Sequence, residues 1–496
     1  SLGTKQLTAD PWKNATEKFD VSSVVSGKVV NLMKNPNQIP LLLSLVLVLN
    51  VEGTSKQEAQ NPSDDYYISW KEHIIDDPVL GPKDLAGSDG LEMADLDSDG
   101  FEDIVSVHEL DTEYGVPLGY VRIAWGTGNP DKWDLTTLAS GSEVASAEDV
   151  SIADADGDGW LDVVVACELA HLIYFKNPGT NHRKIIWDRV IPEITKNRGS
   201  FIRVFFADLN HDGRYEVVAA NKGGENPSIE NAPNNSISFF ELPEDPLKQD
   251  FWKEHVLTSV KIPINSKPID LDQDGDLDIV GGSRAERRIL WLENVGNFKF
   301  EEHSIILEDS LPKNAYITGF NMDFADLNSD RLIDITLNAW PSYLVWLEQP
   351  ASMTMPWKVH LIGDINPDVL VSVRLADIDS DGDLDAFSGS YSLGPRDKDG
   401  EKIGMNDPLG RVSWFKNLGQ GKDWSRQDIL RRKRGMYDKW EARDLDRDGD
   451  LDFIGTRGNS HPYDGVFWLE QMRSSQPGPP FIQARDVDSK IMQFPN

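Results

Sequence analysis

Seven short acidic segments have the residue types and the spacing of a metal site. Each spans nine residues and carries a carboxylate or amide side chain at positions 1, 3, 5 and 9. The seven quartets are Asp95, Asp97, Asp99 and Asp103; Asp154, Asp156, Asp158 and Asp162; Asp208, Asn210, Asp212 and Glu216; Asp270, Asp272, Asp274 and Asp278; Asp326, Asn328, Asp330 and Asp334; Asp377, Asp379, Asp381 and Asp385; Asp444, Asp446, Asp448 and Asp452. Alternate oxygen side chains on a tight turn can converge on one hard cation, position 7 can add a backbone carbonyl, and position 9 can close the shell. We therefore predict several structural Ca²⁺ ions.

These segments differ from an EF-hand in two ways. The glutamate at position 12 is missing from all seven copies, and the flanking residues are typical of strands instead of helices, as in VFFAD before a loop and DVVVA after one. Six copies have glycine at position 6, where the chain must turn sharply. The fifth copy has Arg331 there and is the weakest candidate for a metal site.

The acidic segments recur at the spacing of a repeated structural unit. Their starts are separated by 59, 54, 62, 56, 51 and 67 residues, which fits one four-stranded blade plus loops of variable length. In each unit a strand A leads into the acidic loop and a strand B follows it. Strand C has an aromatic signature, such as WLEN at 291–294, and strand D pairs an aromatic residue with a later histidine, as in Trp252 and His255. Because these histidines recur, we expect them to serve packing or hydrogen bonding.

The two ends of the repeat region predict how the ring closes. Residues 70–75 (WKEHII) resemble a strand D with no A, B or C before it, and the seventh unit has no strand D after Gln471. We therefore predict an all-β fold, a seven-bladed β-propeller of four-stranded blades over residues 67–471, in which the N-terminal strand completes the last blade. Closure of this kind covers the edge strands. Residues 472–496 are expected to form a C-terminal tail.

The N-terminal part has the pattern of an export signal. Lys34 provides a positive start, residues 39–49 (IPLLLSLVLVL) form an apolar run, and Val51 and Gly53 have the small-residue spacing of a cleavage site. We assign residues 33–53 to a signal peptide, 1–32 to a possible upstream extension and 54–66 to a linker. The alternative for the apolar run is a buried strand or helix. The first interpretation predicts a secreted protein, extracellular or periplasmic, with no membrane span, because 11 apolar residues are too few to cross a bilayer.

Charge and cysteine content exclude several classes of protein. The chain has 83 acidic and 49 basic residues, a net charge of −34, which disfavours nucleic acid and anionic membranes as partners. Ligand positions of the loops hold 26 of the acids, so the remainder of the chain is nearly balanced. The single cysteine, Cys167, excludes an intramolecular disulfide framework and a cysteine-rich zinc site. It ends an apolar run and is expected to be buried.

The motif D-x-D-x-D-G-x-x-D between short strands, in seven copies, resembles the VCBS/FG-GAP repeat family. That family includes the head of the integrin α-subunit and several β-propeller lectins, and the likeness covers about residues 67–471. The literal FG and GAP words are not preserved, so the bacterial VCBS branch is the more similar one. The resemblance implies that the loops bind calcium on the side of the ring away from the usual ligand face. It does not settle function, because propellers serve as adhesins, lectins and enzymes.

The opposite rim, formed by the B–C and D–A loops, is the predicted ligand face. Its candidate ligand-binding residues are Glu168, Asn221, Arg287, Asn338, Trp340, Tyr391 and Asn459. Aromatic side chains can stack on sugar rings, and arginine can pair with carboxylate or sulfate groups. The plainer interpretation is that these loops are polar only because water surrounds them.

Two function hypotheses follow from this face. The first is a secreted, calcium-stabilised binding protein, expected to be a monomer, that recognises carbohydrate, polysaccharide or a surface protein. The second is a polysaccharide lyase or sugar dehydratase acting by β-elimination, which needs a base and a positive charge to stabilise an enolate. Its candidates are His108, His171 or His461 as base, Tyr463 as acid, and Arg284 or Arg457 as the neutralising charge. No hydrolase, P-loop or zincin motif occurs in the chain.

Overall fold

The computed structural model describes residues 66–110, 115–183, 185–308, 311–393, 396, 399–400 and 402–495. These residues belong to one compact unit, Gln60–Asn496. The predicted upstream extension, signal peptide and nearly all of the predicted linker lie outside the described residues.

Seven sheets follow one another along the chain, and six of them are antiparallel and have four strands. Blade 1 comprises β2 (Ser88–Ala94), β3 (Asp103–His108), β4 (Tyr120–Trp125) and β5 (Asp134–Ser140). Blade 2 comprises β6 (Ala147–Ala153), β7 (Asp162–Cys167), β8 (Leu172–Lys176) and β9 (Asp188–Val190). Blade 3 comprises β10 (Phe201–Ala207), β11 (Glu216–Asn221), β12 (Asn234–Glu241) and β13 (Lys253–Lys261). Blade 4 comprises β14 (Pro263–Ile269), β15 (Asp278–Ser283), β16 (Arg288–Asn294) and β17 (Phe300–Ser304).

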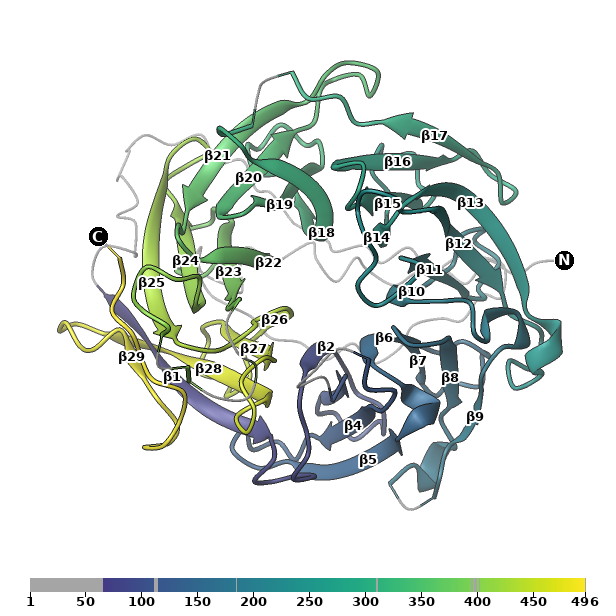
Figure 1. Cartoon of the computed structure of the whole chain (residues 1–496), viewed down its shortest axis with the longest axis horizontal. Coiled ribbons are helices and arrows are strands. Elements are labelled where there is room, and N and C mark those ends of the chain that lie inside the picture. Colours follow the sequence, from purple (N-terminus) through teal and green to yellow (C-terminus); the bar gives the residue numbers. More distant parts are fainter. Residues whose placement is uncertain are drawn as a thin grey trace, which may run out of the picture. The chain divides into compact units, whose positions relative to one another are not determined.

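The remaining blades repeat this order. Blade 5 comprises β18 (Tyr316–Ala325), β19 (Asp334–Trp340), β20 (Tyr343–Glu348) and β21 (Lys358–Asp364). Blade 6 comprises β22 (Val369–Ala376), β23 (Asp385–Tyr391), β24 (Gly410–Asn417) and β25 (Trp424–Arg432). Blade 7 comprises β26 (Trp440–Arg443), β27 (Asp452–Arg457), β28 (Gly465–Ser474), β1 (Tyr67–Asp76) and β29 (Phe481–Ile482). Figure 1 shows the blades in a ring with the first strand of each nearest the centre.

Closure of the ring by the N-terminal strand is confirmed. Strand β1 pairs antiparallel with β28 from Tyr67 opposite Ser474 to Asp76 opposite Val466, with one irregularity near Ile74. The first strand of the described chain is therefore the fourth strand of the last blade (Figure 1). The predicted all-β, seven-bladed propeller is confirmed as well.

The segment assigned to a tail packs on the last two blades. Phe481 and Ile482 form β29, which pairs parallel with β1 and adds a fifth strand to blade 7. Further on, the N–H of Met492 donates to the carbonyl of Arg431 at 2.8 Å, which ties the segment to blade 6. Residues 475–495 thus cover an outer edge that a four-stranded blade would expose.

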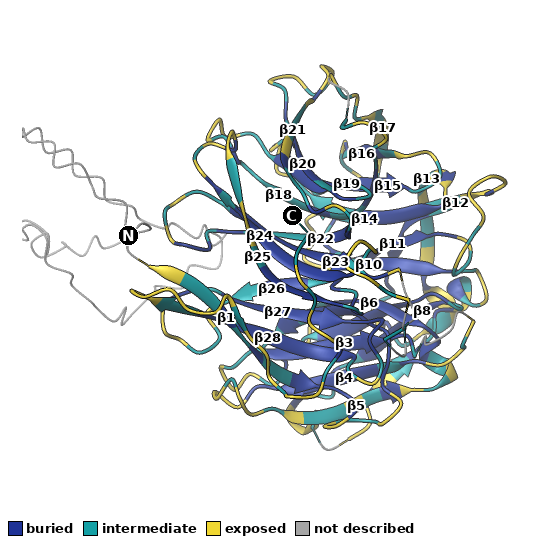
Figure 2. Cartoon of the chain, turned by 60° about the vertical axis from the view of Figure 1, so that its left-hand side comes forward, coloured by how far each residue is buried: buried dark blue, intermediate teal, exposed yellow. Residues whose placement is uncertain are grey.

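The core lies between neighbouring blades, because the second strand of each blade is buried on both faces. Strand β7, with the sequence DVVVAC, is buried at every residue, including Cys167. Its alternate side chains pack toward blade 1 and toward blade 3, which explains a continuous apolar run instead of an alternating one. Figure 2 shows the inner strands as buried, while the exposed residues lie in the connecting loops and on the outer strands.

Helix is nearly absent from the described residues. They contain four short 3-10 segments, Ser142–Val144, Gly179–Asn181, Glu193–Thr195 and Gln249–Phe251. Within the described part of the chain, no helix has the length and apolar character needed to cross a membrane.

Candidate functional site

The acidic loops join the first and second strands of each blade and fold alike. In the first loop, between β2 and β3, the N–H of Gly100 donates to Asp95 Oδ2 at 3.0 Å and the N–H of Phe101 donates to Asp99 Oδ1 at 2.9 Å. Gly100 has φ +90°, a value that glycine adopts without steric cost. In six of the loops the position-6 N–H donates to the position-1 carboxylate in this way.

The fifth loop keeps this geometry although it lacks the glycine. Arg331 takes the left-handed conformation at φ +72°, and its N–H donates to Asp326 Oδ2 at 2.8 Å. The arginine side chain makes that conformation cost about 1–2 kcal/mol more than it would for glycine. Whether this loop binds metal stays a prediction.

The chemistry of the loops fits calcium. In the first, second and fourth loops, one oxygen from each of positions 1, 3 and 5 lies within 4.8 Å of the others. Position 1 contributes a buried Oδ1 atom with no hydrogen-bond partner in Asp154, Asp208 and Asp270. A buried acceptor without a partner is costly, and a cation among the three carboxylates would satisfy it.

The carboxylate at position 9 has a structural function in addition to its predicted ligand role. Asp103 Oδ2 accepts the N–H of Leu96 at 2.9 Å, and its Oδ1 accepts the N–H of Gly126, after the end of β4, at 2.8 Å. This carboxylate thereby holds the loop to the third strand of the blade. Burial, opposed by those two hydrogen bonds, raises the pKa of Asp103 to about 7.

Basic side chains lie against some loops and not others, which sequence reasoning missed. In blades 2 and 6 the residue after the aromatic pair of the third strand is Lys176 or Lys416. Lys416 Nζ contacts Asp379 and lies 3.5 Å from Asp381 Oδ2, while Lys176 contacts Asp156 and Asp158. Calcium has to displace these ammonium groups. In the first loop it also has to displace the guanidinium of Arg183, which contacts Asp97 and lies 3.3 Å from Asp99 Oδ2. We therefore expect the first, second and sixth loops to be weaker sites.

Lys416→Met should tighten calcium binding at the sixth loop by roughly tenfold, because it removes a positive charge that lies 3.5 Å or less from two ligand carboxylates. Equilibrium dialysis against radioactive calcium measures the change. Lys358→Met is the matched control, since Lys358 pairs with Glu348, 3.2 Å away, on an outer strand. Equal calcium affinity in Lys416→Met and wild type would contradict the proposed competition.

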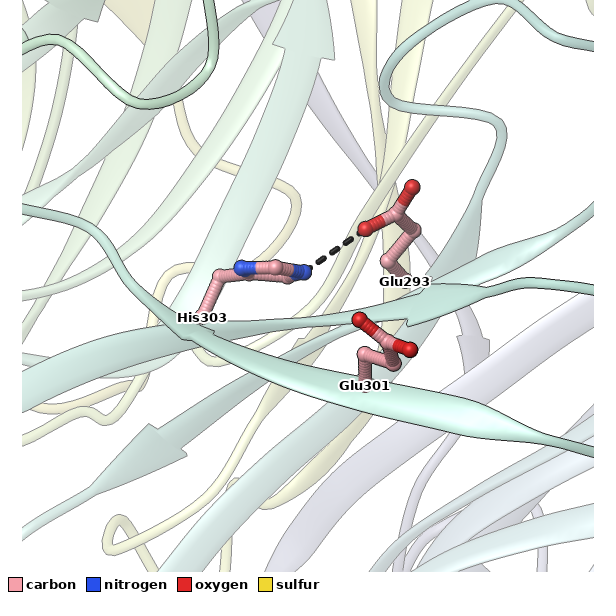
Figure 3. A group of neighbouring side chains, drawn as sticks. All are labelled: Glu293, Glu301 and His303. Atoms are coloured by element: carbon pink, nitrogen blue, oxygen red, sulfur yellow. Dashed lines mark hydrogen bonds and ion pairs between the residues drawn. The ribbon is translucent and has the colours of Figure 1, made fainter.

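The histidines of the fourth strands are confirmed as packing and hydrogen-bonding residues. His73, His255 and His360 stack on an aromatic ring of the third strand at centroid distances of 4.3, 4.4 and 4.2 Å. In blade 4, His303 lies over Trp291, and its Nε2 is 2.6 Å from Glu293 Oε2, with Glu301 alongside (Figure 3). A structural role explains this Glu–Glu–His group, because the same pairing recurs in other blades.

A cavity of about 320 Å³ lies on the rim opposite the acidic loops. The ends of the second strands of blades 1 to 6 each contribute one or more residues to it, as the B–C loops were predicted to do. These residues are Glu109, Glu168, Lys222, Arg284, Asn338, Trp340 and Tyr391. Glu148, Tyr316, Thr318 and Phe320 add side chains from the first strands. We call this cavity the central pocket.

Charged groups are concentrated on one wall of the central pocket. Glu168 contacts Lys222, and both are about 95% buried. Glu148 accepts a hydrogen bond from Arg203 at 3.0 Å. Burial raises the pKa of Glu109 well above its ordinary value, and the carboxylates of Asp89, Glu168 and Glu148 raise it further. The opposite part of the lining is aromatic, with Tyr316, Trp340 and Tyr391.

Five of the predicted site residues meet in this pocket: Glu168, Arg284, Asn338, Trp340 and Tyr391. Arg287 lies beside it, with its guanidinium 4.2 Å from the ring centroid of Tyr316. The side chain of Asn221 makes hydrogen bonds to the backbone: its amide donates to the carbonyl of Arg198, and its Oδ1 accepts the N–H of Gly223.

The three histidines suggested as bases do not line the central pocket. His108 is fully buried between the hydroxyls of Ser88 and Ser106, at 2.6 and 3.0 Å, and burial lowers its pKa to about 3. Nε2 of His171 is 2.8 Å from the carbonyl of Glu143, and burial lowers the pKa of this histidine. Nδ1 of His461 is 3.4 Å from the carbonyl of Leu85.

Blade 7 differs because the C-terminal segment covers the end of its second strand. Arg457 forms a two-pronged ion pair with Asp488, at 2.9 and 2.6 Å, and is 98% buried. Its guanidinium lies 5.8 Å from the ring centroid of Tyr463, and the side-chain amide of Asn459 is 3.8 Å from Met436 Sδ. These three candidates therefore lie outside the lining of the central pocket.

Sequence reasoning missed Asp89 and Glu148, which lie in the innermost strands. The signal that could have found them is an acidic residue near the start of a strand A, in SDGLEMA and AEDVSIA. That end of strand A faces the same rim as the B–C loops.

Comparison with known proteins supports the repeat assignment. Residues 95–165 and 270–337 match the family model described as an FG-GAP-like repeat. These stretches contain the first, second, fourth and fifth acidic loops. No curated protein matches the chain in sequence.

Solved structures show similarity at low sequence identity. YCF48 from Cyanidioschyzon merolae is 10% identical, with a TM-score of 0.47 over 81% of this chain and 98% of that one. BBS1N in complex with ARL6DN, soaked with lead, is 10% identical with a TM-score of 0.43, over 83% of this chain and 99% of that one. The same complex soaked with mercury is 11% identical with a TM-score of 0.43, over 81% and 96%. Nothing about function follows from similarity at this level.

Proposed function

Since the chain is a seven-bladed β-propeller with FG-GAP-like repeats, we propose that it is a calcium-stabilised, secreted binding protein that holds a carbohydrate in the central pocket. The observation that carries this proposal is the convergence of Tyr316, Trp340 and Tyr391 with buried charged groups on one cavity of about 320 Å³. A site of that size is suited to one or two sugar rings.

The two parts of the lining suit the two faces of a sugar. Aromatic rings offer an apolar surface to the C–H face of a pyranose, while carboxylates, amides and guanidinium groups bond to its hydroxyls. Arg284 and Arg396 also line the pocket, beside four carboxylates, and they could donate to a carboxylate or sulfate group on the sugar. Asn338 is held in place because its side-chain amide donates to the carbonyl of Leu370 at 3.1 Å.

A lyase or dehydratase is the second candidate, because Glu109 and Tyr391 supply possible proton donors in the same pocket as Arg284. In that reaction a base removes the proton beside the sugar's carboxylate, and arginine stabilises the enolate. Lys222 also lines the pocket, and once its proton has passed to the paired carboxylate of Glu168 it is the candidate base in place of the histidines.

Trp340→Ala should weaken binding of an acidic oligosaccharide by at least tenfold, because stacking on an aromatic ring contributes about 1.5 kcal/mol or more. Isothermal titration of the calcium-loaded protein with uronic-acid and neutral oligosaccharides measures the affinity. Trp133→Ala is the matched control, since Trp133 is also half-buried but lies on the rim with the acidic loops.

Ultraviolet absorbance of the same mixtures reports unsaturated sugar products. Binding without absorbance supports the binding protein, and absorbance that is lost in Lys222→Met supports the lyase. If no oligosaccharide binds and no product forms, the carbohydrate proposal is wrong.

A further inference from the structure

Three buried carboxylates from the first two blades meet beside the central pocket. Asp89 is in β2, Glu109 follows β3, and Glu148 is in β6; they are 1%, 7% and 5% exposed. One oxygen of each lies within 4.8 Å of the others. Gly90 permits this approach, because a Cβ atom there would lie 2.6 Å from the backbone oxygen of Glu148.

The oxygens of this cluster are poorly satisfied by the protein. Both carboxylate oxygens of Asp89 and Oε1 of Glu109 are buried and have no hydrogen-bond partner in the described structure. A buried acceptor without a partner costs about 1–3 kcal/mol, and more when it is charged. Glu148 is different, because Arg203 donates to it at 3.0 Å and favours its ionised form.

Charges around the cluster leave an excess of negative charge. Two more acids, Glu168 and Asp438, act electrostatically on the three carboxylates of the cluster. A further acid, Glu225, acts on Glu168. The cationic side chains acting on the same set are Arg203, Lys222, Arg284 and Arg396. These cations therefore offset part of the negative charge of the ionised carboxylates, and a bound cation would offset more.

We propose that Asp89, Glu109 and Glu148 bind a divalent cation, with Ca²⁺ as the best fit, at a site separate from the acidic loops. A purely carboxylate ligand set selects hard cations. Oxygens on opposite sides of a Ca²⁺ ion lie roughly 5 Å apart, which matches the spacing of the cluster. Glu109 and Glu148 also line the central pocket, so the side of the ion facing the cavity is available to water or to a ligand oxygen. The site does not depend on the ligand being a carbohydrate.

Counting bound metal tests this site. Chelator-treated protein is equilibrated with Ca²⁺ and, in parallel, with Mn²⁺, and the ions per chain are measured by elemental analysis. The variant Asp89→Asn/Glu109→Gln should hold one ion fewer than wild type. Glu225→Gln is the matched control, because Glu225 lines the same cavity outside the cluster and should leave the count unchanged.

Crystals soaked in Mn²⁺ give an independent readout. An anomalous peak between Asp89, Glu109 and Glu148 supports the site, and its absence when the loop sites are filled overturns it. An unchanged ion count in the double variant also overturns it and indicates that the carboxyl groups share protons instead. If the double variant does not fold, Glu109→Gln alone is used. Because the count uses no sugar, its result is independent of the Trp340→Ala titration.

Discussion

Removing calcium should lower the melting temperature by roughly 8 °C. Each site filled at a hundredfold excess over its dissociation constant adds about 2.7 kcal/mol to the free energy of unfolding. Three such sites add about 8 kcal/mol, and a folded unit of this size loses about 1 °C for each kcal/mol. Without metal the carboxylates at positions 1, 3 and 5, which lie within 4.8 Å of one another, also repel each other. Calorimetry with and without EDTA measures the shift.

Two controls separate calcium from other effects of the chelator. Adding back an excess of Ca²⁺ should restore the melting temperature, and Mg²⁺ should do so poorly because it demands a smaller, octahedral site. Asp272→Asn/Asp274→Asn should reduce the calcium-dependent increase in melting temperature by the amount that one loop contributes. A melting temperature that is the same with and without EDTA would show that the loops are folded by the protein alone.

Glu72→Gln should reduce the free energy of unfolding by roughly 3 kcal/mol, the lower end of the cost of breaking a buried ion pair. The lower end applies because Asp488, 3.4 Å from Arg432, still compensates part of the remaining charge. Glu72 lies in β1, which closes the ring, and its two oxygens accept bonds from Arg432, at the end of β25, at 2.8 and 2.9 Å. Both side chains are at least 98% buried. The pair therefore fastens the N-terminal strand to blade 6, and urea denaturation measures its loss.

The matched control is Glu470→Gln on the neighbouring strand. Glu470 pairs with Lys71 and His73 at the surface, where such a pair contributes about 0–1 kcal/mol. Adding Arg432→Met to Glu72→Gln should recover much of the loss, because no buried charge is then left unpaired. Equal losses in Glu72→Gln and Glu470→Gln would contradict the role assigned to the buried pair.

The same pair gives a pH dependence with a definite sign. Burial raises the pKa of Glu72, but Arg432 outweighs it and holds that pKa below the ordinary value of 4.5. A lowered pKa in the folded state means that the stabilisation is complete above about pH 4.5 and is lost as the pH falls below that value.

The acidic loops and the blade count were predictable because they depend on local spacing. Oxygen side chains at positions 1, 3, 5 and 9 of a nine-residue turn specify the loop, and six intervals of similar length specify seven blades. Ring closure was predictable as well, since WKEHII had no other strands to pair with. The fourth-strand histidines could be assigned to packing because they recur in several blades.

The central pocket was predictable only in part. The B–C ends were expected to face one rim, and Glu168, Arg284, Asn338, Trp340 and Tyr391 do converge there. Glu109 holds the position in its blade that Glu168 and Arg284 hold in theirs, and it lines the pocket, whereas His108, one residue earlier, points between Ser88 and Ser106. Side chains alternate along a strand, so a shift of one residue decides whether a group is buried or faces the cavity.

The sequence by itself determined the repeating unit, its acidic loops and the closure of the ring, because each follows from residues close together in the chain. Tertiary structure alone decided which charges meet at the centre. Asp89 and Glu148 are far apart in sequence and become neighbours because blades 1 and 2 pack side by side, with Gly90 permitting the close approach. Likewise, only the fold brings Asp488 of the C-terminal segment onto Arg457 and removes that arginine from the ligand face.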